Sequence, residues 1–233
     1  MRFAFFATFF DRSASGKDID PADHARVLDL IADIPGLKRG LVYRAERTVG
    51  KNYPNDDEPP QLGLELYFDD VLAMEAALSR TGPMQALAAP DALPSIAGAE
   101  VQQQCMVIRQ YDVPEPTAWG DREFCTFLVH YPGTAADLNL WLDHYVEHHT
   151  AVMKTFPGIR EIEVATRMDW IGFLPWARVD YMQRNKVVFD SGPALTAALE
   201  SPVRAEMTKD FNSFPAFEGG NVHYPLLTRE ILR

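Results

Sequence analysis

The stretch IPGLKRGLVYR (residues 34–44) returns in the second half of the chain as FPGIREIEVATR (residues 156–167). A second pair follows in the same order, because AALSRTGPMQAL (residues 76–87) reappears as AALESPVRAEM (residues 197–207). Two matched pairs at similar spacing are hard to obtain by chance, and an internal repeat determines the architecture wherever one is present. The chain is therefore predicted to contain two copies of one structural unit.

Each copy is predicted to run strand, helix, strand, strand, helix, strand. Strands are indicated by alternating residues rich in aromatic and β-branched side chains, and helices by apolar residues at helical spacing. In the first half we expect strands at 3–10, 37–44, 62–68 and 101–111, and helices at 23–34 and 71–87. In the second half we expect strands at 124–131, 159–167, 176–183 and 222–230, and helices at 137–156 and 192–211. Pro202 is unfavourable inside the last helix and could divide it.

A proline-containing segment, DVPEPTAWG (residues 112–120), separates the two copies. Such a composition is typical of a linker, so the predicted domains are residues 1–111 and 122–233, joined by a linker at 112–121. Helices on one face of an antiparallel sheet form an α+β layer, and two such sheets can face one another and close. The predicted fold class is α+β, with two tandem ferredoxin-like repeats whose antiparallel sheets form an α+β barrel within one chain.

The composition is that of an ordinary globular protein, with 47% hydrophobic and 24% charged residues among 233. The net charge is −11 and the Lys and Arg residues are scattered, so neither nucleic acid nor a membrane is expected as a partner.

Cys105 and Cys125 lie in apolar strand-like runs, which is typical of buried free thiols in a reducing compartment. The apolar N-terminal run stops at Asp11 and reads as a first strand. The protein is expected to be cytoplasmic.

One segment of the second half resembles a known family signature. HYVEHHTAVMKTFPGI (residues 144–159) looks like the signature of the EthD family, in the dimeric α+β barrel superfamily. His149 takes the position of the signature His, eight residues before Pro157. His144 and Tyr145 take the two aromatic positions, so the first departs from the usual Tyr.

The resemblance extends to the second helix of this half. LESPVRAEMTKDFNSF (residues 199–214) resembles the family's pattern there, with Asp210 and Phe214 at its Asp and Phe. The first half has Val27 at the position of the signature His, and His24 is not a convincing substitute. The resemblance therefore implies one functional half and one structural half. It also implies that the fused pair can form the barrel alone, because family members are usually homodimers of single repeats; a homodimer of the whole chain is left open.

The resemblance implies a small aromatic, lactone or polyketide-like substrate, held in the cleft between sheet and helices. Related enzymes include muconolactone isomerases and olivetolic acid cyclase, which use a His with polar partners and need no metal or coenzyme. A fold hosts many functions, so the residues are weighed separately. We expect no cofactor, and a substrate that is aromatic or carries a carboxylate.

His149 is the leading candidate for catalysis. An unperturbed imidazole titrates near neutral pH, so His149 could act as a general base or acid. The alternative is a structural His that bonds the helix to the sheet. Tyr145 is a candidate catalytic partner from the same helix.

His144 and His148 share a helix face at metal-ligand spacing. No third ligand is evident, so no metal is assigned, and His144 is placed among the substrate-binding candidates.

Two charged residues stand out in the strand predicted at 176–183. Alternation places Arg178 and Asp180 on one face, which is expected to point into the barrel, where charges are costly unless paired. Arg178 could hold a substrate carboxylate or phenolate, and Asp180 could orient a catalytic His. The alternative is an internal ion pair that holds the two sheets in register.

Trp176 begins the same predicted strand and is assigned to substrate binding. With Trp170, Phe173 and Tyr181 it would form an aromatic rim, which suits a flat apolar substrate. The alternative is that these rings fill the core.

Two further pairs could reach a shared cavity from neighbouring strands. His130 and Tyr131 end the first strand of the second half, and His223 and Tyr224 lie in its last strand. His130 is taken as a candidate catalytic residue, and Tyr131 and His223 as candidates for substrate binding.

The sequence contains no glycine-rich phosphate loop, no Gly-x-Ser-x-Gly elbow and no complete metal motif. We therefore predict a cofactor-independent acid/base enzyme, a lyase or isomerase, that acts on a small aromatic or ring-derived acid. His149 would be the acid/base, with Tyr145, His130 and Asp180 as partners and Arg178 as the anion anchor. The alternatives are a non-catalytic barrel that binds a small ligand, and a haem protein with His149 or His223 as the iron ligand.

Overall fold

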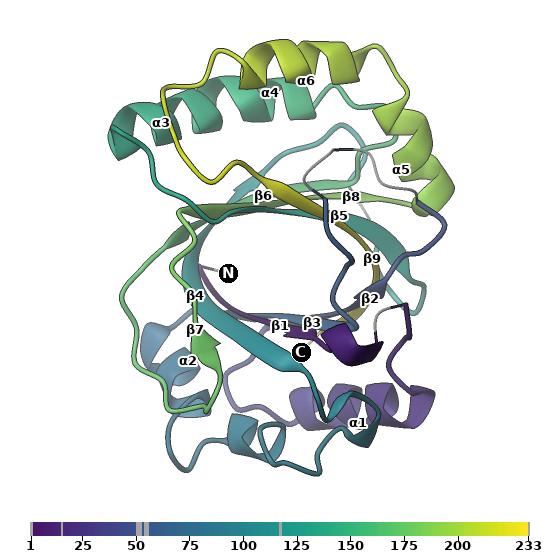
Figure 1. The fold of residues 1–233 in the computed structure, drawn as a ribbon, viewed down its shortest axis with the longest axis vertical. Coiled ribbons are helices and arrows are strands. Elements are labelled where there is room, and N and C mark those ends of the chain that lie inside the picture. The colour runs from purple at the N-terminus through teal and green to yellow at the C-terminus, as the bar shows by residue number, and fades with distance from the viewer. Residues whose placement is uncertain (1, 15, 50–52, 54–55, 117, 233) are drawn as a thin grey trace.

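The computed structural model describes residues 2–14, 16–49, 53, 56–116 and 118–232. Thr117, inside the predicted linker, lies outside the described residues. Eight antiparallel strands close into a barrel in the order β1-β3-β2-β9-β5-β8-β6-β4, and β4 pairs again with β1 (Figure 1). Their bounds are β1 Phe3–Phe10, β2 Arg39–Ala45, β3 Leu62–Phe68, β4 Glu100–Tyr111, β5 Phe124–Tyr131, β6 Glu161–Arg167, β8 Gln183–Phe189 and β9 Val222–Leu232. The predicted intrachain α+β barrel is confirmed.

The helices lie outside the barrel, in two groups on opposite sides (Figure 1). One group is α1 Pro21–Ala32 and α2 Val71–Ala77, with the short 3₁₀ turns η1 Arg12–Ala14, η2 Pro83–Ala86 and η3 Pro94–Ile96 elsewhere in the first half. The other group is α3 Leu138–His144, a π-helical turn η4 Tyr145–His149, α4 Thr150–Met153, α5 Gly192–Leu199 and α6 Val203–Phe211. Pro202 separates α5 from α6, as expected for a residue that cannot donate a backbone hydrogen bond. Of the helices in the described part of the chain, none has the length and hydrophobicity needed to cross a bilayer.

Each barrel strand has an outer face toward its helices and an inner face toward the barrel axis, because side chains alternate along a strand. In β5, Phe127 and Tyr131 pack outward against the second helix group, while Phe124 and Leu128 pack inward. In β1, Phe5 packs outward and Phe6 inward. The result is three hydrophobic cores, one under each helix group and one inside the barrel.

The barrel interior also holds a buried network of charges. Arg39 donates to Glu161 at 2.9 Å and to Glu230 at 2.5 Å. Lys186 donates to Glu65 at 3.2 Å and to Glu163 at 3.1 Å. Burial raises the pKa of Glu163 well above its usual range, whereas the nearby Lys186 opposes that shift. The strands of the two halves are thus joined by side chains as well as by backbone bonds.

The strand predicted at 176–183 was wrong. The chain leaves β6 at Arg167, and the next barrel strand, β8, begins only at Gln183. The intervening loop crosses to the first half, where β7 Ala177–Arg178 pairs in parallel with Gln102 and Gln103 of β4. The predicted strand therefore covers a loop and ends where the true strand starts.

Candidate functional site

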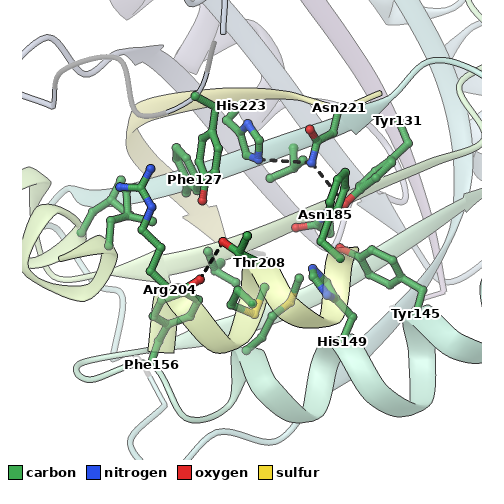
Figure 2. A pocket seen from close by; sticks show the side chains of 18 of the residues that line it. Phe127, Tyr131, Tyr145, His149, Phe156, Asn185, Arg204, Thr208, Asn221 and His223 are labelled. Carbon is green, nitrogen blue, oxygen red and sulfur yellow. Dashed lines mark hydrogen bonds between the residues drawn. The ribbon is translucent and has the colours of Figure 1, made fainter. Parts of the chain in front are cut away.

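A pocket of about 370 Å³ lies between the outer face of the second-half sheet and the helices η4, α4, α5 and α6 (Figure 2). Most of its wall is aromatic or aliphatic, including Phe127, Phe156, Val187 and Phe211. Tyr53, from the connection between β2 and β3, also lines it, so both halves contribute. An apolar cleft of this volume with a few convergent polar groups is the usual form of a small-molecule site.

The π-helical turn η4 places two polar side chains, Tyr145 and His149, in the pocket wall. An α-helix has about 3.6 residues per turn, so residues four apart drift around the helix. The wider π turn at Tyr145–His149 offsets this drift and keeps Trp141, Tyr145 and His149 on the buried face of one helix. Asp137 begins the helix by accepting the backbone N–H groups of Asn139 and Leu140. Single π turns of this kind occur often at functional sites.

His149 forms a dyad with Asp210 of α6. Its Nδ1 lies 2.7 Å from Asp210 Oδ2, and because a carboxylate can only accept, Nδ1 carries the proton. The other carboxylate oxygen, Oδ1, lies 3.2 Å from His144 Nε2, so Asp210 joins two histidines. Burial lowers the pKa of His149 to about 4, against the opposing effect of Asp210. At neutral pH His149 is a neutral imidazole whose unprotonated nitrogen is Nε2, and its ring points into the pocket (Figure 2).

His223 is held by a second carboxylate across the pocket. Its Nδ1 lies 2.8 Å from Asp56 Oδ1, and its ring stacks on Tyr53 at a centroid distance of 4.0 Å. Asn221 donates to His223 Nε2 and to the Tyr131 hydroxyl, both at 3.4 Å (Figure 2). Both ring nitrogens of His223 therefore have a hydrogen-bond partner. Among the described residues, only Nδ1 of His149 has one.

Asn185 of β8 is a buried amide whose hydrogen-bonding capacity is unmet. Its side chain lines the pocket and is 2% exposed, and neither its amide nitrogen nor its carbonyl oxygen has a hydrogen-bond partner. Leaving such a group unpaired costs about 1–3 kcal/mol. A ligand with a carbonyl or hydroxyl oxygen at this point would satisfy Asn185.

Two buried phenols and one cation also belong to the polar lining. Burial raises the pKa of both Tyr131 and Tyr145, so both hydroxyls stay protonated and can donate. Arg204 of α6 lies at the edge of the pocket, with its guanidinium 5.0 Å from the Tyr53 ring centroid. The pocket therefore offers a base, several neutral donors and a positive charge at one end.

The predicted site residues fall into three groups. His149, Tyr145, Tyr131 and His223 line the pocket. His144 does not line it, but it bonds to Asp210, the partner of His149. His130 lies on the opposite face of β5, inside the barrel, so it cannot act with His149. The reason is the two-residue period of a strand, which sends the neighbours His130 and Tyr131 to opposite sides.

The placements predicted for Arg178, Asp180 and Trp176 were wrong. Arg178 is exposed and lies 3.8 Å from the Trp170 ring centroid. Asp180 pairs at the surface with Arg167 and is 78% exposed. Trp176 packs against Phe5 and Phe9, in the first-half core. All three lie on the crossing loop and not on a barrel strand, which removes them from the pocket.

Four contributors to the site were not chosen from the sequence. Asp210 was seen only as part of the family pattern, and Asn185 sat in a stretch not recognised as a strand. Asp56 and Arg204 carry no local signal, because the contact of Asp56 with His223 spans 167 residues. Alternation within QRNKVVF, the sequence of β8, would have placed Asn185 on the same face as Val187 and Phe189.

His144 and His148 lie close together, with ring centroids 4.9 Å apart. Within the described residues no group of three or more His, Cys, Asp or Glu side chains is arranged to hold a metal ion.

Comparison with models of protein families and with curated proteins found no match. Solved structures do match. A candidate monooxygenase from Fusobacterium nucleatum superposes with a TM-score of 0.63 at 10% identity, over 100% of this chain and 94% of its own. An anthrone oxidase-like protein gives a TM-score of 0.63 at 11% identity, over 99% of this chain and 93% of its own. The chain has the dimeric α+β barrel fold. An EthD family protein from Bacillus halodurans is also among its structural neighbours, over 42% of this chain and 95% of its own, with a TM-score of 0.34 at 16% identity.

In this α+β barrel the pocket lies under the second helix group, on the half that carries the EthD-like signature. His149 takes the His position of the signature, and Asp210 takes the Asp position of the second-helix pattern. The two residues come from separate helices, and their bond lies beside the pocket that His149 lines. The resemblance in sequence and the geometry of the pocket thus point to the same residues.

Proposed function

We propose that this α+β barrel is a cofactor-independent acid/base enzyme that moves a proton on a small aromatic or ring-derived acid, as a lyase or an isomerase. The observation that carries the proposal is the His149–Asp210 dyad at the wall of an aromatic pocket. A neutral imidazole is a competent base at neutral pH, and a carboxylate on its other nitrogen stabilises the imidazolium formed when it takes a proton.

The chemical step is proton abstraction from a carbon next to a carbonyl group. His149 Nε2 removes the proton, and the electron pair of the C–H bond moves onto the carbonyl oxygen to give an enolate. Asn185 can donate its amide N–H to that oxygen, because the amide has no other partner. Donors fixed in place before the reaction stabilise a developing oxyanion without reorganisation.

The substrate class follows from the pocket walls. Flat rings pack well against Phe127, Phe156 and Phe211, and Arg204 at the edge suits a carboxylate or phenolate. Returning the proton to a different carbon isomerises the substrate, whereas expelling a group from the enolate makes the enzyme a lyase. Two proteins of similar fold are named as a candidate monooxygenase and as anthrone oxidase-like, so molecular oxygen is included as a co-reactant in the test.

The experiment is deuterium exchange followed by NMR. Ring acids and phenols with an acidic C–H next to a carbonyl group are incubated in D₂O with the protein, with and without oxygen. Loss of one C–H signal at a rate proportional to enzyme supports the proposal. The His149→Gln variant should exchange no faster than buffer, while the surface variant Arg178→Ala should match wild type. Equal exchange by wild type and His149→Gln would overturn the assignment of His149.

A second candidate function, haem binding, would use the same atom, His149 Nε2. An imidazole held by a carboxylate at Nδ1 is also the form in which His binds a haem iron through Nε2, and Arg204 could pair with a propionate. Bound haem would supply redox chemistry. The absorption spectrum of the purified protein, before and after haem is added, distinguishes this candidate, because ligation by His149 produces a Soret band that His149→Gln lacks. A non-catalytic binding barrel would instead show saturable ligand binding with no exchange.

A further inference from the structure

The barrel interior contains a second polar site, separate from the pocket. Arg184 of β8 is 0% exposed, and its Nε and both terminal nitrogens have no hydrogen-bond partner. The neighbouring residue Asn185 faces outward into the pocket, so Arg184 faces the barrel axis. A buried guanidinium with five N–H groups and no acceptor is a strong indication of an unidentified acceptor, because buried charges in proteins are normally paired.

Among the described residues, the two other buried cations of the interior, Arg39 and Lys186, behave differently. Arg39 is bonded to Glu161 and Glu230, and Lys186 to Glu65 and Glu163. Arg184 lies two residues before Lys186 on the same inner face, yet none of these carboxylates comes within hydrogen-bond distance of it. Each of these four acidic groups is bonded to Arg39 or Lys186, and none is bonded to Arg184.

Aromatic rings hold the Arg184 guanidinium in place. It lies 4.9 Å from the Phe6 ring centroid and 4.8 Å from that of Tyr181. Tyr181 is itself fixed to β4, because its hydroxyl donates to Gln102 and its backbone exchanges two hydrogen bonds with the Gln104 amide. Contacts with ring faces leave the N–H groups at the rim of the guanidinium free to donate.

Two further orphaned groups lie on the same inner surface. His130 faces Arg184 directly across the β5–β8 pair, and its Nε2 is buried without a partner. Burial, aided by Arg184, lowers the pKa of His130 well below its usual value, so it is neutral and can donate from Nε2 in one tautomer. The Thr8 hydroxyl, on the inner face of β1 two residues from Phe6, is also buried and unpartnered.

The charged group facing Arg184 is Glu65 of β3, which interacts with it electrostatically but makes no hydrogen bond to it. Glu65 Oε2 bonds to Tyr43 and to Lys186, and Oε1 has no partner. Lys186 thus offsets the negative charge that would otherwise repel an anion. Burial lowers the pKa of Arg184 to about 10, so it keeps its charge at neutral pH.

We propose that the interior of the barrel binds a small planar oxyanion, of the carboxylate or nitrate type, on Arg184, with His130 as a second donor. The fork of a guanidinium matches two oxygens of a planar anion. The site faces the barrel axis, on the other side of the sheet from His149 and Asn185, and is independent of the proposed proton-transfer site.

The test is titration of the full-length protein with formate, acetate and nitrate. Isothermal calorimetry and the melting temperature are measured at constant ionic strength in a bulky sulfonate buffer. Wild type should bind one anion per chain, with a melting temperature that rises with the logarithm of anion concentration above half saturation. Arg178→Ala removes an exposed arginine and should bind as wild type does. Asn185→Leu alters the opposite face and should also keep the anion.

Arg184→Met replaces the guanidinium with an apolar chain of similar length and should abolish both signals. If this variant does not fold, as judged by circular dichroism, Arg184→Lys keeps the charge without the fork and should bind at least about tenfold more weakly. Binding of equal strength in the Arg184 variants, or no binding of any of the three anions to wild type, would overturn the proposal. Loss of binding in Asn185→Leu but not in Arg184→Met would place the anion in the pocket instead.

Discussion

His149 Nδ1 and Asp210 Oδ2 lie 2.7 Å apart although the two residues are 61 positions apart in the chain. The bond joins the π-helical turn to α6 and fixes which nitrogen of His149 carries the proton. This assignment makes the proposed mechanism specific, because only the tautomer with a free Nε2 can take a proton from a substrate in the pocket.

Asp210→Asn should lower the deuterium-exchange rate by about 10²–10⁴-fold. An amide can donate to Nδ1, which favours the tautomer whose proton sits on Nε2, where the base is needed. The melting temperature should change little, because the bond geometry is kept. The rate is measured by NMR in D₂O, with Arg178→Ala as the control. An Asn variant as fast as wild type would show that the dyad does not set the tautomer for catalysis.

The pH dependence of exchange should report the low pKa of His149. Burial lowers this pKa to about 4, and the base is active above its pKa, so the rate constant should fall only as the pH drops toward that value. Between about pH 6 and 8 the profile should be flat. The rate is measured over the range in which circular dichroism shows the native fold. A midpoint near 6.5, the ordinary value for His, would indicate a different base.

Asn185→Leu should separate function from stability. Removing a donor to the enolate should slow exchange by about 10²–10³-fold. The same change removes a buried amide without partners, so the unfolding free energy should rise by as much as about 1–3 kcal/mol. Exchange by NMR and chemical denaturation are measured on the same preparation. A structural Asn would give the opposite stability change, and unaltered exchange would remove Asn185 from the mechanism.

The repeat in the sequence was sufficient to predict the barrel, because it fixed both the number of strands and the positions of most of them. The family signature located His149. The positions of Tyr131 at the end of one predicted strand and of His223 in another placed both within reach of a shared cavity. These predictions succeed because they depend on local periodicity, which packing in the barrel preserves.

The failures have a common physical cause at β8. Its sequence, QRNKVVF, is polar on both faces, because Arg184 and Lys186 serve the interior while Asn185 serves the pocket. A strand with polar residues on both faces lacks the apolar alternation by which strands are recognised. The strand was therefore predicted in the preceding loop, and Arg178 and Asp180 were predicted as site residues. Contacts such as Asp56 with His223 depend on tertiary folding and leave no local pattern.

Arg178→Ala and Asp180→Ala should leave ligand binding and exchange unchanged. Arg178 covers the Trp170 ring at the surface, a contact that contributes about 0.5–1 kcal/mol at an exposed site. Asp180 pairs with Arg167 in water and contributes less still. Thermal-shift assays with aromatic acids check both variants. A lost shift in Arg178→Ala alone would mean that the crossing loop reaches the ligand after all.

Lys186→Met should be the most destabilising single change in the barrel interior. Lys186 lies between Glu65, Glu161 and Glu163, and removing one partner of a buried ion pair costs about 3–5 kcal/mol. At roughly 2–4 °C per kcal/mol for a chain of this size, the melting temperature should fall by about 6–20 °C. Arg184→Met is the matched control, since it deletes a neighbouring buried cation that holds no carboxylate. Adding Glu65→Gln to Lys186→Met should recover part of the loss, because it removes a carboxylate left unpaired. A melting temperature for Lys186→Met equal to that of Arg184→Met would mean that Lys186 does not neutralise these carboxylates.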